Sequence, residues 1–161
     1  MADVCRTNLL VDDFAMFSDR LNSVGLKAGD DNSMIALAAE HGTLSFVPAK
    51  NSYFFESLPC VDAVEEGYGA ISFRMKAPKG ASFAVELQTK DNCGESEYKS
   101  SWHYVEGFTG QTEIVVIPLK LFGGANARAI DGFSWGTWDF YDERGFVWTL
   151  SDVEFTCNPS D

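Results

Sequence analysis

Apolar and polar residues alternate along most of the chain, in short runs that end at glycine, proline or polar turns. In residues 69–77, Ile71, Phe73 and Met75 occupy every second position and polar residues stand between them. Residues 82–90 repeat this pattern after a Pro-Lys-Gly turn. A period of two residues is typical of a strand with one buried face. The sequence therefore predicts a strand in each segment.

The same alternation predicts strands along the rest of the chain, each bounded by turn residues. They cover residues 8–14, 42–49, 52–58, 98–108, 111–122, 129–138 and 146–157. Only residues 15–26 and 33–40 could be helical, and both segments are short. Eight or nine strands with one or two short helical turns predict an all-β, two-sheet β-sandwich. The length fits a single domain over residues 1–161.

Charge narrows the class of partner. The chain has 24 acidic and 12 basic side chains, a net charge of −12, and its basic residues are scattered. Phosphate backbones and anionic membranes would be repelled, so we expect no nucleic-acid partner and no membrane insertion. A neutral or cationic ligand is compatible with this charge. No run approaches the roughly 20 apolar residues of a transmembrane helix, and the first residues lack the apolar segment of a signal peptide.

The four cysteines are too far apart in sequence for a C-x-x-C zinc or redox motif. Three disulfide pairings are possible. We expect Cys5–Cys157, because the terminal strands of a sandwich often lie side by side, and Cys60–Cys93. Four free thiols in a cytosolic protein are the alternative. Disulfides would place the protein in an oxidising compartment, and we expect a secreted protein whose Met1 is a start codon placed before the mature sequence.

Five segments occur in an order that resembles a known family. They are VDDF (11–14), GYGAISFRMKAPKGASFAVELQT (67–89), TEIVVIPLKLF (112–122), AIDGFSWGTW (129–138) and WTLSDVEF (148–155). Together they resemble galactose-binding-domain-like β-sandwiches, especially carbohydrate-binding modules appended to glycan-active enzymes. The four cysteines and the phenylalanine-rich style resemble secreted fungal members. The resemblance implies an antiparallel jelly roll that holds a sugar on a concave face or in loops at one end. It also implies a structural Ca²⁺ near the chain termini.

Polar side chains on two central strands are the first candidates for sugar contacts. Arg74 alternates with the apolar residues of 69–77, and Glu86 and Gln88 do so in 82–90. A tight hairpin would place these three side chains on one sheet surface. Guanidinium, carboxylate and amide groups supply the donors and acceptors that sugar hydroxyls need. A solvated cross-strand salt bridge, worth little energy, explains the same pattern equally well.

Aromatic side chains are the second set of candidates, because they can stack on the apolar face of a sugar ring. The set is Tyr53, Trp102, Tyr104, Trp135, Trp138 and Trp148. Trp148 has apolar neighbours and is expected in the core, whereas Trp135 fits either a core or a surface position. Trp138 follows a break at Gly136–Thr137 and precedes the charged loop 142–144. We therefore predict that Trp138 faces solvent.

Acidic residues in three segments are candidate calcium ligands. Asp12 (or Asp13), Asp30 (or Asp31) and Asp152 come from segments that a jelly roll brings to one edge. Ca²⁺ takes six to eight oxygen ligands. No EF-hand-like spacing supports the site, and the second segment fits a polar turn equally well.

These features favour a non-catalytic, monomeric carbohydrate-binding module that recognises an extracellular polysaccharide such as cell-wall β-glucan. An enzyme on the same jelly roll is an alternative. A hydrolase needs two carboxylates that flank the glycosidic bond, and Glu56, Glu86 and Glu97 are candidates.

A lyase would need a base beside a positive charge, for which His103, Tyr104 and Arg74 are candidates. A third alternative is a secreted effector whose sandwich binds protein.

Overall fold

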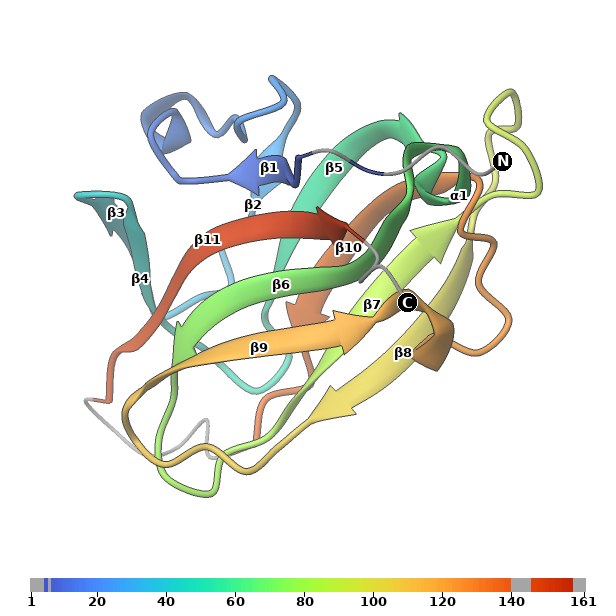
Figure 1. Ribbon diagram of the computed structural model, residues 1–161. Helices are drawn as coiled ribbons and strands as arrows, with labels where there is room; N and C mark the ends of the chain where they lie inside the picture. Colours follow the sequence, from blue (N-terminus) through green and yellow to red (C-terminus); the bar gives the residue numbers. More distant parts are fainter. Residues whose placement is uncertain (1–4, 6, 140–145, 158–161) are drawn as a thin grey trace.

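The computed structural model describes residue 5 and residues 7–139 and 146–157, which form two packed antiparallel sheets (Figure 1). The six-stranded sheet has the order β3 (Ala36–Glu40), β4 (Thr43–Val47), β11 (Trp148–Cys157), β6 (Tyr68–Lys76), β9 (Thr112–Pro118), and β1 (Leu9–Asp12) also pairs with β11. The five-stranded sheet has the order β2 (Ala28–Gly29), β5 (Tyr53–Val61), β10 (Ile130–Gly136), β7 (Phe83–Thr89), β8 (Lys99–Val105). This confirms the predicted all-β, two-sheet jelly-roll sandwich.

Two segments differ from the expected secondary structure. Residues 33–40 do not form a helix: they contain the edge strand β3, which pairs with β4 and alternates in burial. In residues 15–26 the helical part is only the 3₁₀ turn η1 (Phe17–Asp19).

Two short helical turns lie outside the predicted segments. Helix α1 (Ala63–Glu66) begins where the Asp62 carboxylate accepts the Glu65 N–H at 2.9 Å, and it ends at Gly67, whose φ is 80°. A side-chain cap and a left-handed glycine are ordinary helix limits. The other turn is η2 (Leu119–Leu121), which follows β9 directly.

The connection between β6 and β7 crosses from one sheet to the other. It turns at Pro78 and Gly80, and the Gly80 N–H donates to the Phe108 carbonyl at 2.8 Å. Strands β6 and β7 therefore do not pair with each other, and the expected hairpin does not form. The polar faces of these two strands point to opposite sides of the molecule.

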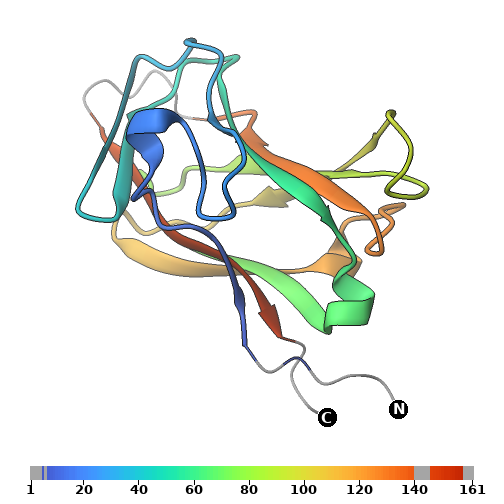
Figure 2. The same ribbon diagram turned by 90° about the horizontal axis from the view of Figure 1, so that it is seen from above.

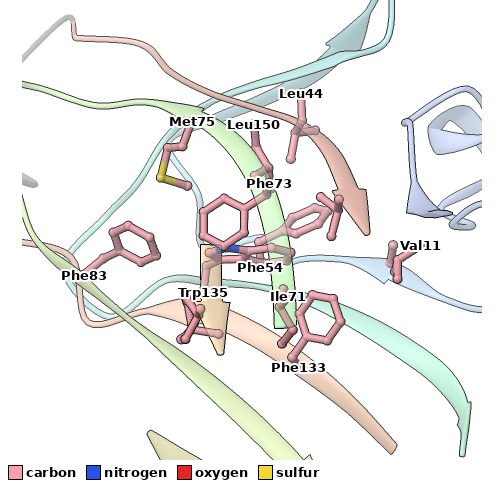
Figure 3. Packing of buried hydrophobic residues seen from close by; sticks show 14 of the residues in the cluster. Val11, Leu44, Phe54, Ile71, Phe73, Met75, Phe83, Phe133, Trp135 and Leu150 are labelled. Atoms are coloured by element: carbon pink, nitrogen blue, oxygen red, sulfur yellow. The ribbon is translucent and has the colours of Figure 1, made fainter. Parts of the chain in front are cut away.

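The inner faces of the two sheets form one aromatic core (Figure 3). Trp135 contacts Phe73 of the other sheet with the ring centroids 5.5 Å apart, and Phe133 of its own strand at 5.2 Å. Both contacts are edge-to-face, the arrangement that aromatic quadrupoles favour. Alternation in β10 thus buries Phe133 and Trp135 together, as the sequence predicts for a shared face.

Each sheet carries one disulfide, and both predicted pairings are confirmed. Cys157 at the end of β11 bonds to Cys5, just before β1, and β1 lies beside the end of β11 (Figure 2). Cys60 in β5 bonds to Cys93 in the loop between β7 and β8. None of the helices in the described ranges has the length and apolar character needed to cross a membrane.

Candidate functional site

A groove of about 660 Å³ lies on the outer face of the five-stranded sheet. The register places residues of neighbouring strands side by side along one row that crosses the sheet. From β2 to β8 the row is Gly29, Phe55, Ser134, Glu86 and Trp102. Strands lie about 4.8 Å apart, so the row is about 19 Å long. A row of this length spans several sugar rings.

Small residues on β10 keep the floor of the groove low. Ser134 and Gly136 line it, and Gly132 lies next to them on the same face. A Cβ atom at Gly132 would lie 2.7 Å from the Glu56 carbonyl oxygen, too close for any side chain. No large side chain of β10 therefore fills the groove, and the larger side chains stand on the strands on either side of β10.

Aromatic rings form the two walls. Trp102 on β8 is 50% exposed and Tyr98, just before β8, is 51% exposed. Tyr53 and Phe55 stand on β5 at the other side of β10, and Tyr53 is 38% exposed. Tyr104 points outward one row further along, opposite Ala84, and is more exposed than Trp102. Exposed rings around a groove can stack on the apolar face of a sugar.

Glu86 is the fixed polar group of the groove. Its carboxylate accepts hydrogen bonds from Ser134 Oγ at 3.0 Å, Gln88 Nε2 at 2.9 Å and Ser100 Oγ at 2.5 Å. The ion pairs of the described residues do not include Glu86. Three uncharged donors thus hold a carboxylate acceptor beside Trp102, and this arrangement suits a ligand rich in hydroxyl groups.

Four residues that the sequence analysis named as candidates, Tyr53, Glu86, Gln88 and Trp102, lie together in this groove. Arg74 lies elsewhere, because β6 belongs to the other sheet. It points away from the core on that sheet and pairs with Asp152, with 3.1 Å between Nε and Oδ2. The expected juxtaposition of Arg74 with Glu86 and Gln88 is wrong, since the β6–β7 connection crosses the sandwich.

Two predicted tryptophans are core residues. Trp135 is fully buried, and Trp138 is only 3% exposed although it borders one end of the groove. The chain does break at Thr137, whose φ is 56°, but this turn directs the Trp138 ring inward. The ring stacks on Phe83 at 5.5 Å and its Nε1 donates to the Ser52 carbonyl at 2.9 Å. The prediction that Trp138 faces solvent is therefore wrong. Trp148 is buried, as predicted. The charged loop 142–144 lies outside the described residues.

Phe55, Tyr98 and Ser134 are groove residues that the sequence reasoning missed. The signal for Phe55 was present: in β5 the inward Phe54 alternates with Tyr53 and Phe55, so both outward positions are aromatic. Tyr98 and Ser134 have no such signal, because strand pairing brings them to the groove. The pairing of β10 with β5 and β7 places Ser134 there, and the pairing of β8 with β7 places Tyr98 there.

The three predicted calcium ligands do not come together. Asp12 is buried in the interior, Asp152 pairs with Arg74, and the Asp30 carboxylate accepts the Met34 N–H at 3.0 Å. Within residues 7–139 and 146–157, no three His, Cys, Asp or Glu side chains are placed to hold a metal ion. The described residues therefore do not fit the predicted calcium site.

A buried carboxyl pair joins the two sheets at one edge. Asp12 of β1 and Glu56 of β5 are at most 1% exposed. One oxygen of Asp12 and both oxygens of Glu56 receive no N–H or hydroxyl donor from the described residues. Burial raises the pKa of Glu56 well above its usual range, and the charge of Asp12 raises it further, which favours the protonated form of Glu56. Burial also raises the pKa of Asp12.

The residues considered for catalysis are separated by the sheets. Glu56 points into the core and Glu86 points into the groove, so they lie on opposite faces of one sheet. His103 and Tyr104 are consecutive in β8 and therefore point to opposite faces. The pair Glu56–Glu86 and the lyase set are not assembled at one place. Glu97, the third hydrolase candidate, is exposed directly before Tyr98 of the groove.

Searches for sequence relatives find no matching family model and no matching curated protein. Solved structures match over nearly the whole chain. A family 11 carbohydrate-binding module from Clostridium thermocellum, in complex with a β-1,3-1,4-mixed-linked tetrasaccharide, has a TM-score of 0.60 at 12% identity, over 96% of this chain and 98% of the module. A family 30 module of a cellulosomal cellulase from Clostridium thermocellum has a TM-score of 0.56 at 13% identity, over 96% of this chain and 95% of the module.

A family 29 carbohydrate-binding module, solved as an arginine-to-alanine point mutant, has a TM-score of 0.51 at 13% identity, over 94% of this chain and 92% of the module. At identities this low the likeness establishes a shared architecture. The chain has the β-sandwich fold of carbohydrate-binding modules.

Proposed function

We propose that this protein is a non-catalytic module that binds a polysaccharide in the groove on the outer face of the five-stranded sheet. The observation that carries the proposal is the joint occurrence of exposed rings and a fixed carboxylate. Trp102, Tyr98 and Tyr53 offer stacking surfaces, and Glu86 and Gln88 offer hydrogen bonds to hydroxyl groups. Apolar walls with a few fixed polar groups are typical of ligand sites.

A neutral or cationic glycan fits the charge of the chain. The net charge is −12 and Glu86 adds a negative group inside the groove, so polyanions would be repelled. The tetrasaccharide bound to the family 11 module supports a β-linked glucan as the first ligand to test. Stacking on a solvent-exposed groove predicts an affinity of roughly micromolar to millimolar.

The module is proposed to act outside the cell, as a monomer and as one domain over residues 1–161. Two disulfides support an oxidising compartment. A bound Ca²⁺ has no support from the described acidic residues, and a chelator is therefore included in the test.

The test is a glycan array, with and without EDTA, followed by calorimetric titration of Trp102→Ala. Because this variant removes a half-exposed ring of the groove, we expect at least tenfold weaker binding and little change in folding stability. Val116→Ala, an exposed position on the other sheet, is the matched control and should bind like the parent protein.

Three results would contradict the proposal. Equal binding by Trp102→Ala and the parent protein would exclude the groove as the site. New reducing ends or unsaturated products would indicate an enzyme instead. The absence of any glycan signal would favour the protein-binding alternative.

A further inference from the structure

A second cavity, of about 340 Å³, lies beyond the β5 wall of the groove. It is lined by residues of the segment 19–32 together with Phe55, and Phe55 also lines the first groove. One half-buried ring therefore separates the two spaces and borders both. The two cavities lie on the same outer face, because Gly29 of β2 is the register partner of Phe55.

The floor of this second cavity is backbone, because Gly29 has no side chain there. The Arg20 side chain lies over it, with Cδ and Nη1 each 3.8 Å from where a Cβ atom of Gly29 would stand. Arg20 is held in place from two sides. Its guanidinium carbon lies 4.4 Å from the centre of the Phe17 ring, and Nη1 lies 3.9 Å from an Asp30 oxygen. The planar guanidinium of Arg20 thus covers one side of the second cavity, next to the Phe17 ring.

The rim of the cavity offers both donors and acceptors. Lys27 and Asn32 are exposed and supply ammonium and amide groups, whereas the Asp30 carboxylate is nearly buried beside Arg20. The positive charges of Arg20 and Lys27 are balanced by Asp19 and Asp30, so the site does not select a charged ligand. Such a mixture suits the hydroxyl groups of an uncharged sugar.

Tyr53, a residue of the first groove, lies near the acidic turn 30–31. Its ring lines the groove, and partial burial raises the pKa of its hydroxyl, as do the negative charges of Asp31 and Asp30. The acidic turn at 30–31 therefore lies close enough to act on a groove residue.

We propose that the groove continues past Phe55 and that the second cavity is an additional sugar subsite. This inference rests on the proposed function and adds to it a dependence on chain length. A short oligosaccharide would occupy only the part between Trp102 and Phe55. A longer one would also place a ring between Phe55 and Arg20, with its hydroxyls at Lys27 and Asn32.

The experiment fills the second cavity and leaves the first intact. In Gly29→Leu the new Cβ meets only the flexible Arg20 side chain at ordinary contact distance, and the leucine would displace the guanidinium and occupy the cavity. Lys27→Ala is a second, milder variant that removes an exposed donor. Gly123→Leu is the control, because this exposed glycine has open space around it and lines neither cavity.

The probe is a series of β-1,3-1,4-linked glucan oligosaccharides, from disaccharide to hexasaccharide, titrated by calorimetry. We expect the parent protein and Gly123→Leu to bind the hexasaccharide at least tenfold more tightly than the trisaccharide. Gly29→Leu should lose this gain and keep the parent affinity for the trisaccharide, and Lys27→Ala should lose part of it. Trp102→Ala should weaken binding at every length.

Failure of the inference and failure of the proposed function give different results. If Gly29→Leu and Lys27→Ala keep the full gain with length, the second cavity is not a subsite although the groove binds glycan. If the parent protein binds none of the oligosaccharides, both proposals fail for this ligand class. Thermal unfolding of each variant confirms that it is folded; if Gly29→Leu is not, the Lys27→Ala titration decides between these results.

Discussion

The two sheets have similar inner faces and very different outer faces. Inside, both contribute large apolar side chains, such as Phe73 from one sheet and Trp135 from the other. Outside, the six-stranded sheet carries the Arg74–Asp152 ion pair and exposed aliphatic residues such as Ile114 and Val116, whereas the five-stranded sheet carries a groove with aromatic walls. An ion pair on a solvated strand contributes little to stability. The packing of the two inner faces therefore supplies most of the stability of the fold, and the side chains of an outer face can form a ligand-binding groove.

The disulfides give the largest expected contrast between the two sheets. Cys5–Cys157 and Cys60–Cys93 close segments of 152 and 33 residues. Replacing both cysteines of a disulfide by serine should lower the free energy of unfolding. The loop-entropy model gives a loss of about 5 kcal/mol for the first disulfide and about 4 kcal/mol for the second. Only the loss of Cys60–Cys93, which holds β5 to the β7–β8 loop of the groove sheet, should also weaken glycan binding. Denaturant titration and calorimetry measure both effects, and equal loss of binding in the two variants would refute this distinction.

Trp135→Ala tests the inner face of the groove sheet. The ring is fully buried between the sheets, so its removal should lower the free energy of unfolding by about 3 to 5 kcal/mol. Glycan affinity, measured well below the unfolding midpoint, should stay close to that of the parent protein. Trp102→Ala on the outer face should show the opposite pattern. A stability change under about 1 kcal/mol for Trp135→Ala would contradict its assigned place in the core.

The mildest expected effect is the pH dependence that comes from the carboxyl pair between the sheets. Because burial raises the pKa of Glu56, the folded state keeps a proton that the unfolded chain loses above the ordinary value of 4.5. Stability should therefore fall as the pH rises from that value through the raised pKa of the folded state. Glu56→Gln, whose amide does not ionise, should flatten this decline and raise stability at alkaline pH.

The control for that measurement is Glu106→Gln, an exposed position that should leave the pH profile unchanged. Thermal unfolding between acidic and alkaline pH measures both variants. A Glu56→Gln profile parallel to that of the parent protein would show that Glu56 does not hold the proton.

The sequence predicted the strands well where one face is apolar. Alternation located β6, β7 and β10, and it placed Phe133 and Trp135 on one face. It failed at residues 33–40, because the alanine-rich edge strand β3 carries little apolar alternation and is defined by its pairing with β4. Edge pairing is a tertiary contact and leaves a weak local signal.

The candidate site was predicted only in part, for a related reason. Glu86 and Gln88 were found from the polar positions of their own strand and Trp102 from its aromatic side chain, and the pairing of β7 with β8 brings the three together. Arg74 was misplaced because its chain neighbour β7 is not its neighbour in the sheet. Trp138 was misplaced because polar residues surround it in sequence, while its ring turns inward onto Phe83.

The sequence by itself determined the class of fold and the two faces of most strands, because local alternation fixes which side chains point the same way. The cysteine pairing was also predicted, from the expectation that the terminal strands of a sandwich lie side by side. Only the tertiary structure decided which strands share a sheet, and hence that Phe55, Ser134, Glu86 and Trp102 form one row. The physical reason is that a strand's pairing partners are chosen by the packing of both sheets around the core, and the chain between two strands carries little information about that choice.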